Sequence, residues 1–317
     1  MTLVSTERVF VTPDCDPMRG RVIWSPVKSL WLIGMTAIGV VGGVMTFSWD
    51  ALAVFMVLTA GTICAGHSVG MHRLLIHRSF ATPIWVEHTL VYLGTLVGMA
   101  GPFGMIKAHD MRDWMQRQSD CHDHAAHRQG MLKDYWWQTH CILDMAHPPK
   151  FEIESKVRND RFYRFLEATW MAQQIPLAVV LFAIGGWAWV IWGICLRVSI
   201  SLTGHWLIGH LAHTRGPQTW VIDGLAVQGH DVAGAGLITF GEAWHNNHHA
   251  WPQSAKLGVL PGQTDPGWWF VSALGWLGLA RDIKTPDHLE LREGLRRLDQ
   301  ERRPRREPEP RRETARP

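Results

Sequence analysis

Long uncharged stretches in two parts of the chain predict helices that cross a membrane. Residues 29–49 and 51–70 contain no charged side chain and are separated by a single aspartate. Each stretch is long enough to cross a hydrocarbon layer of about 30 Å as an α-helix. A third stretch, residues 168–213, contains one charged residue and is divided by the pair Gly185-Gly186. The pattern predicts four transmembrane helices in two hairpins, at about residues 29–49, 50–70, 168–187 and 188–210.

Two further apolar stretches are predicted to lie at the membrane surface instead of crossing it. Residues 84–105 contain Glu87, His88 and Pro102. A full crossing there would also place the histidines before and after it on opposite sides of the membrane, where they could not share a site. Residues 267–280 are too short to span, and their tryptophans favour the headgroup level.

The basic residues indicate which side of the membrane the polar segments occupy. Lysine and arginine are frequent in residues 106–167 and in residues 1–28. Because basic loops stay in the cytosol, we expect both termini and both polar lobes, residues 106–167 and 214–285, on the cytosolic side. The predicted fold is an all-α integral membrane protein with a cytosolic helical cap that carries the histidines.

The end of the chain has a different composition. Residues 286–317 contain eight acidic residues and ten arginines. So few apolar side chains cannot form a core of their own. We therefore divide the chain into a cytosolic segment 1–28, a membrane domain 29–285 and a charged tail 286–317, which starts as a short helix and is otherwise largely disordered.

Composition excludes several other classes of protein. The formal net charge is only +3, and the basic residues of the tail are interleaved with acidic ones, which argues against a nucleic-acid binder. The five cysteines form no C-x-x-C pair and indicate neither a disulfide framework nor a zinc ribbon. The 18 histidines are the residues that suggest chemistry.

Three histidines in FGEAWHNNHHAWP form the sharpest candidate site. His245, His248 and His249 have the spacing i, i+3, i+4, which places them on one face of a helix and aims them at one volume. Three imidazolium charges would repel one another, so the set is stable when neutral, and a metal ion is the natural partner of neutral imidazoles. The residues expected to hold the ring tautomers from behind are Glu242, Asn246 and Asn247.

Further histidines occur where apolar stretches meet the polar lobes. His72 and His77 occur in GMHRLLIHRSF, His109 in KAHDMRDW, and His213 ends GHWLIGHLAH. On a straight helix residues 72 and 77 would lie about 140° apart, so they converge only if the helix frays between them. The seven candidate metal ligands are His72, His77, His109, His213, His245, His248 and His249.

This donor set indicates two ions rather than one structural zinc. Structural zinc takes four ligands, commonly including cysteine, whereas these imidazoles have no cysteine nearby in the sequence. Imidazole suits iron, copper or zinc. Iron with mainly histidine ligands and an open position is suited to binding O₂.

These motifs resemble a known family, the membrane-bound fatty acyl desaturases, and most of all their acyl-CoA Δ9 type. GMHRLLIHRSF looks like the family's first histidine box and FGEAWHNNHHAWPQSAKLG like its third. GHWLIGHLAH resembles its last membrane-spanning segment, whose final histidine is also a metal ligand. The resemblance covers about residues 29–285 and implies four spans and two ferrous ions held on the cytosolic side.

The resemblance also implies a reaction and its partners. O₂ at the two irons removes hydrogen from two neighbouring methylene groups, which leaves a cis double bond in the acyl chain of an acyl-CoA or a lipid. A narrow tunnel holds that chain. The electrons come from a cytochrome b5-like protein or a ferredoxin, which we expect to be separate because the sequence has no H-P-G-G haem motif.

The second histidine box departs from the family pattern H-x-x-H-H. At the matching place the chain reads His109-Asp110-Met111-Arg112-Asp113, and a guanidinium cannot ligate a metal. We take Asp113 as the replacement ligand. Gly209 also stands where the family often has an asparagine that reaches an iron through water. The alternatives are that one iron is weakly bound, or that the site is completed by His122, His124 or His127.

Other functions fit parts of the sequence. A di-iron hydroxylase on the same scaffold would produce an alcohol in place of an alkene. A membrane haem electron-transfer protein would use histidines inside the spans, such as His67 and His205, but would not need clusters at i, i+3, i+4. A catalytically inactive relative kept for binding is a third alternative.

Overall fold

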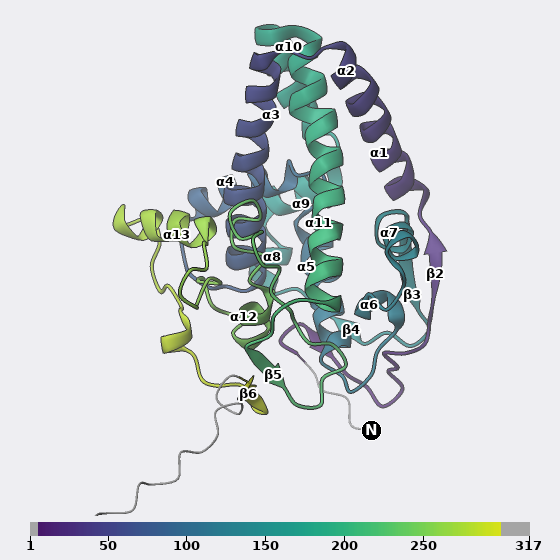
Figure 1. Ribbon diagram of the computed structural model, residues 1–317, viewed down its shortest axis with the longest axis vertical. Helices are drawn as coiled ribbons and strands as arrows, with labels where there is room; N and C mark the ends of the chain where they lie inside the picture. The colour runs from purple at the N-terminus through teal and green to yellow at the C-terminus, as the bar shows by residue number, and fades with distance from the viewer. Residues whose placement is uncertain (1–5, 299–317) are drawn as a thin grey trace, which may run out of the picture.

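Helices make up most of the computed structural model, which describes residues 6–298 (Figure 1). The α-helices are α1 (Pro26–Ala37), α2 (Gly43–Met45), α3 (Trp49–Gly61), α4 (Ile84–Thr95), α5 (Pro102–Gln116), α6 (Asp123–Ala126), α7 (Met131–His140), α8 (Ser155–Arg158), α9 (Arg161–Thr169), α10 (Gln174–Val190), α11 (Arg197–Thr214), α12 (His245–Ala250) and α13 (Pro266–Trp276). The π-helical segments are Ile38–Gly42, Thr62–Ile76 and Ile191–Leu196, and a 3₁₀ turn covers Pro286–His288.

Within residues 6–298, three continuous helices are long and apolar enough to cross a bilayer. They cover Pro26–Met45, Trp49–Ile76 and Gln174–Thr214, so the π-helical segments continue the α-helices. Exposed apolar side chains such as Val44 and Trp187 occur on these helices, as contact with lipid requires. The prediction of a helical membrane protein is confirmed at this level.

The longest of these helices bends at Gly186. This residue has φ 62° and ψ −158°, a conformation that glycine adopts without the steric penalty of a Cβ atom. The chain folds back there, so that Leu181 before the bend packs against Gly193 after it. Trp189 Nε1 donates to Asp50 Oδ2 at 2.6 Å, which ties this bend to the start of α3. Figure 1 shows the bend in α10 and the connection from α2 to α3 at the same end of the molecule.

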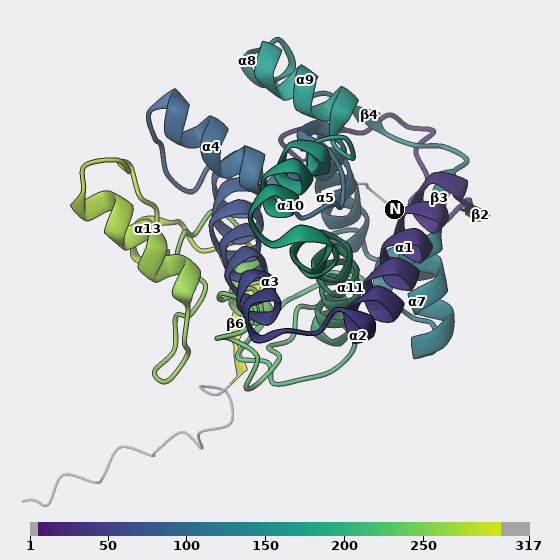
Figure 2. The same ribbon diagram turned by 90° about the horizontal axis from the view of Figure 1, so that it is seen from above.

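Helices α4 and α13 lie across the direction of the long helices (Figure 2). Neither is among the described helices that are long enough to span. Both expose tryptophans, including Trp85 on α4 and Trp276 on α13, the latter 87% exposed. The crosswise arrangement is the one expected of helices at a membrane surface, and that location stays a prediction.

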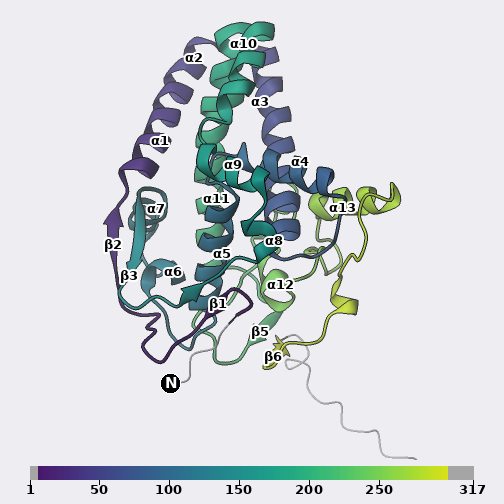
Figure 3. The same cartoon turned by 180° about the vertical axis from the view of Figure 1, so that it is seen from behind.

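The fold is mostly helical, as expected, and three short antiparallel ribbons connect distant segments. Strand β1 (Val9–Phe10) pairs with β4 (Lys150–Phe151), β2 (Gly20–Trp24) with β3 (Cys141–Met145), and β5 (Trp220–Ile222) with β6 (Leu295–Arg297). Segments outside the helices still have to pair their backbone N–H and C=O groups, and these ribbons do so. Figure 3 shows β2 and β3 beside α7.

Within the described residues, the short helix predicted at the start of the charged tail is reduced to a 3₁₀ turn at Pro286–His288. Gly294 has φ 74°, which breaks a helix, and the chain enters β6 directly after it. Arg292 Nη1 donates to the carbonyl oxygen of His249, so residues 286–298 contact the polar lobe. The predicted disorder concerns mainly residues 299–317, which lie outside the described residues.

The segment Thr62–Ile76 is the central element of the packing. Its Val69 and Leu74 pack with Leu90 of α4 and Val271 of α13 in one buried cluster. Gly70 allows α4 to come close, because a Cβ atom there would lie 2.5 Å from the carbonyl oxygen of Leu90. This packing fixes the end of the segment, where two of the predicted histidines lie.

Candidate metal centre

Four histidines from three elements form a first group. They are His72 and His77 around the end of the segment Thr62–Ile76, His109 of α5 and His248 of α12, and one ring nitrogen from each lies within 4.8 Å of the others. The Nε2 atoms of His77 and His109 are 3.2 Å apart. His72 and His248 are buried and the other two are half-buried.

π-helical geometry brings His72 and His77 together. The N–H of His77 donates to the carbonyl oxygen of His72 at 3.0 Å, an i to i+5 bond. Residues five apart then occupy successive turns, and the two ring centroids lie 4.8 Å apart. The expectation that the helix must fray between them is wrong, because a wider helical turn achieves the same convergence while keeping the backbone bonded.

Three histidines form a second group. They are His213 at the end of α11 and His245 and His249 of α12. His245 Nε2 lies 3.0 Å from Nε2 of His213 and 3.0 Å from Nε2 of His249. His213 Nδ1 donates to the carbonyl oxygen of Gly209 at 2.7 Å, so its Nε2 presents a lone pair to the group.

Helix α12 divides its three histidines between the two groups. The sequence predicted one shared volume for His245, His248 and His249, but His248 faces the first group while the other two belong to the second. The groups adjoin, because the ring centroids of His245 and His248 are 5.4 Å apart. A short helix crossing between two sets of imidazoles therefore produces two neighbouring sites.

The electrostatics of both groups favour neutral rings. Burial, followed by the neighbouring imidazoles, lowers the pKa of His77, His245, His248 and His249 well below the usual value. Ring nitrogens of neighbouring imidazoles lie about 3 Å apart within each group. Neutral imidazole is the form that ligates a metal, so the donor set fits transition-metal ions that favour imidazole.

Carboxylates hold two rings of the first group from behind. Glu242 Oε2 lies 2.7 Å from His72 Nδ1, and Asp110 Oδ1 lies 3.0 Å from His109 Nδ1. Burial raises the pKa of Glu242, but contact with His72 and with Arg73 outweighs it and leaves the pKa below its usual range. Both Nε2 atoms are thereby left free to bind a metal. Glu242 was predicted in this role, whereas Asp110 was missed although it adjoins His109.

The predicted role of Asn246 and Asn247 is wrong. The Asn246 side chain accepts from the N–H groups of Thr219 and Trp220 and donates to the carbonyl oxygens of Trp220 and Gly229. These four bonds saturate the amide. Asn247 accepts from Trp220 Nε1 and donates to Leu257 O and Gln263 Oε1. Both amides therefore fasten loops to α12 instead of orienting imidazoles.

The altered second box lies along α5, whose His109 belongs to the first group. Asp113 forms an ion pair with Arg117 at 2.7 Å, and Arg112 Nη2 donates to Gln138 Oε1 at 2.9 Å. Asp113 is not a member of either histidine group. Its proposed role as a ligand stays a prediction.

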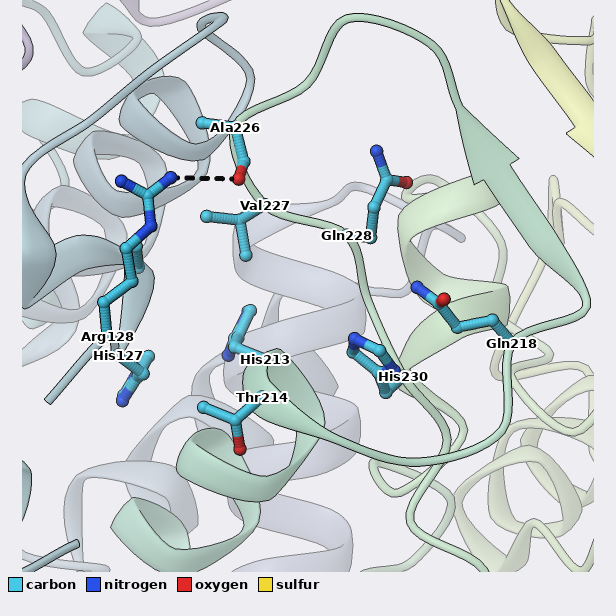
Figure 4. A pocket seen from close by; sticks show the side chains of 10 residues that line it. His127, Arg128, His213, Thr214, Gln218, Ala226, Val227, Gln228 and His230 are labelled. Atoms are coloured by element: carbon cyan, nitrogen blue, oxygen red, sulfur yellow. Dashed lines mark hydrogen bonds between the residues drawn. The ribbon is translucent and has the colours of Figure 1, made fainter. Parts of the chain in front are cut away.

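A third group, which the sequence did not reveal, lies beside the second. Asp134 of α7 accepts at Oδ2 from Nδ1 of His127 and Nδ1 of His210, each at 2.9 Å, and all three residues are buried. No periodic spacing links these positions. His127 and His213 also line a cavity of about 390 Å³ (Figure 4).

Comparisons with known proteins identify relatives of this chain. No protein-family model matches the chain. An sn-1 stearoyl-lipid 9-desaturase of a Synechocystis species is 34% identical over 244 residues, which are 76% of this chain and 74% of that protein. An sn-2 palmitoyl-lipid 9-desaturase of a Nostoc species is 31% identical over 75% of this chain and 82% of that protein. An acyl-CoA C20 Delta5-desaturase of Anemone leveillei is 29% identical over 78% of each chain.

Fold and site together define a helical membrane protein with two adjoining histidine groups suited to metal ions. The similarity to the Synechocystis desaturase extends over about three-quarters of both chains. The chain belongs to the fatty acyl desaturase family. It is an oxidoreductase that introduces a double bond into fatty acyl chains.

Proposed function

We propose that the seven histidines hold two iron ions, one in each group. His72, His77, His109 and His248 would bind the first ion. His213, His245 and His249 would bind the second. The observation that carries this proposal is the gathering of ring nitrogens from four separate parts of the chain into two adjoining groups.

The bound irons would supply the oxidising power, together with O₂, that an unactivated C–H bond requires. The balance is one O₂, two electrons and two protons, which with a CH₂–CH₂ unit give a CH=CH unit and two water molecules. The residues of the chain orient the imidazoles and exclude bulk water: Glu242 and Asp110 fix two rings, while the packed segment Thr62–Ile76 keeps His72 buried.

We propose four transmembrane segments with the histidine groups on the cytosolic side. The bend at Gly186 turns the apolar helix Gln174–Thr214 into two arms. With Pro26–Met45 and Trp49–Ile76, these arms make four passes and bring all the histidine groups to one end. Cysteine-accessibility labelling of a residue near Trp49 and of one near Arg19 tests this, since the two sites should react from opposite sides of the membrane.

The substrate is proposed to be an acyl chain attached to a lipid or to coenzyme A, with a separate electron donor of the cytochrome b5 or ferredoxin type. The named relatives act on acyl-lipids and acyl-CoAs, which supports an acyl chain on either carrier. Expression in a host that lacks its own desaturase, followed by gas chromatography and mass spectrometry of the lipid and acyl-CoA fractions, should reveal a new cis-alkene. A hydroxylated acid without a new alkene would instead indicate the di-iron hydroxylase.

Glu242→Gln should weaken iron binding about 10- to 100-fold, because the amide loses the charge that holds His72 Nδ1–H in place. The measurement is a competition titration of ferrous iron against a chelator, with the purified protein in detergent. Glu152→Gln is the matched control, since Glu152 is exposed and pairs with Lys150. Equal iron affinity in both variants would contradict the orienting role of Glu242.

A further inference from the structure

The second histidine group has one imidazole fewer than the first. The first group contains four rings and the second three. Arg112 is a cation bonded to Gln138 and Gly209 has no side chain, so neither of these positions adds a ligand. Asp113, the replacement expected from the sequence, is paired with Arg117 at 2.7 Å, which leaves room for a donor from another segment.

His127 has the features of such a donor. Its side chain is 2% exposed, its Nδ1 is bonded to Asp134 Oδ2 at 2.9 Å, and its Nε2 is buried without a hydrogen-bond partner. A buried imidazole normally satisfies both nitrogens. The combination of a carboxylate on Nδ1 and an unpartnered Nε2 is the arrangement that metal-binding histidines have in proteins.

His127 lies beside the second group. Its ring is nearly parallel to that of His213, with centroids 5.1 Å apart and planes inclined by 5°. His127 ends α6 and His213 lies near the end of α11, and Figure 4 shows both at the cavity they line. The chain thus brings a ring from the segment after α5 against a ring already assigned to the second ion.

The backbone and the surrounding bonds hold His127 in this position. Its φ is 53°, a left-handed conformation that is strained for a non-glycine residue. Asp134 is itself fixed, because its Oδ2 also accepts from His210 Nδ1 and from Trp206 Nε1, each at 2.9 Å. Strain of this kind persists where the surroundings impose it, and it is concentrated at functional sites.

A separate metal site between His127, Asp134 and His210 is the weaker interpretation of the same residues. Their facing atoms already form N–H···O bonds to one oxygen, so a cation there would have to displace two protons and would leave Trp206 Nε1 close to the metal. The free Nε2 of His127 needs no such exchange.

We propose that His127 completes the second iron site, with its Nε2 as a fourth imidazole beside those of His213, His245 and His249. This inference rests on the proposed di-iron function and adds one residue to it. His127 would replace the missing histidine of the second box from a segment about 15 residues further along the chain. Asp134 would be its positioning residue.

The decisive variant is His127→Gly, with iron per chain measured by inductively coupled plasma mass spectrometry on protein purified in detergent. Glycine adopts the left-handed backbone of this position freely, so the local fold should persist. We expect iron to fall from two ions per chain to one, and added imidazole to restore the second ion. His127→Gln should lose the same ion, without rescue by imidazole.

His124→Gln is the matched control. His124 comes from the same segment and also has a buried Nε2 without a hydrogen-bond partner, but its ring stacks on Trp137 and not on a member of the second group. We expect this variant to keep two irons.

The outcomes separate the inference from the function on which it rests. A wild-type protein with fewer than two irons contradicts the di-iron proposal itself. Two irons in both the wild type and His127→Gly overturn only the role of His127. Loss of both irons, loss without rescue by imidazole, or an equal loss in His124→Gln would also overturn it, since each points to a structural effect instead of a ligand.

Discussion

His248→Ala should abolish double-bond formation. His248 is the only residue of α12 in the first histidine group, and it is 5% exposed. Removing it leaves three imidazoles for the first ion and opens a gap next to His72 and His77, whose ring centroids lie 4.6 and 4.7 Å from its own. We expect the rate to fall by about 10³-fold or more, a loss of about 4 kcal/mol of transition-state stabilisation.

The measurement is the amount of new alkene per expressed chain in a host without its own desaturase, with iron per chain determined on the purified variant. His288→Ala is the control, because His288 is exposed and contacts Thr285 away from both histidine groups. Wild-type alkene levels in His248→Ala would be incompatible with an iron site in the first group.

Asp265→Ala should cause the largest loss of stability. Asp265 is 2% exposed and its Oδ1 pairs with Nη2 of Arg73, itself 1% exposed, at 2.9 Å. Its Oδ2 accepts from the N–H groups of Leu257 and Gly258, and its Oδ1 from that of Trp268 at the start of α13. Removal takes away the closest carboxylate of a buried guanidinium and leaves only Glu242 at 3.7 Å, which costs about 3–5 kcal/mol.

Thermal unfolding of the protein in detergent should show this loss as a decrease of Tm on the order of 10 °C. Asp223→Ala is the control, since Asp223 forms an exposed ion pair with Arg296 and should change stability by less than about 1 kcal/mol. The double variant Arg73→Leu/Asp265→Ala should recover part of the loss, because the poorly compensated charge of Arg73 is gone. A double variant less stable than Asp265→Ala would contradict this explanation.

The membrane character and the seven histidines could be predicted because both depend on local patterns. Uncharged stretches of about 20 residues have few alternatives to a membrane helix. The i, i+3, i+4 spacing at His245 places three rings on one helix whatever the surroundings. The identity of the family followed from such short motifs, and the comparisons bear it out.

Other features depended on contacts that no local pattern encodes. The ribbons β1–β4, β2–β3 and β5–β6 join residues more than 70 positions apart, so neither strand reveals its partner. The environment of His127 also depends on other segments, because Asp134 of α7 and His210 of α11 form it. The saturated amide of Asn246 likewise became visible only with the loops that it binds.

The sequence by itself determined that this chain enters a membrane and that its polar parts carry many imidazoles, because hydrophobicity and residue identity are properties of each segment alone. Only the tertiary structure decided how those imidazoles are divided between the two histidine groups. A π-helical turn brings His72 and His77 together, and α12 places His248 in one group and His245 and His249 in the other. Helical pitch and the crossing of packed segments set these positions, and both arise from the whole fold.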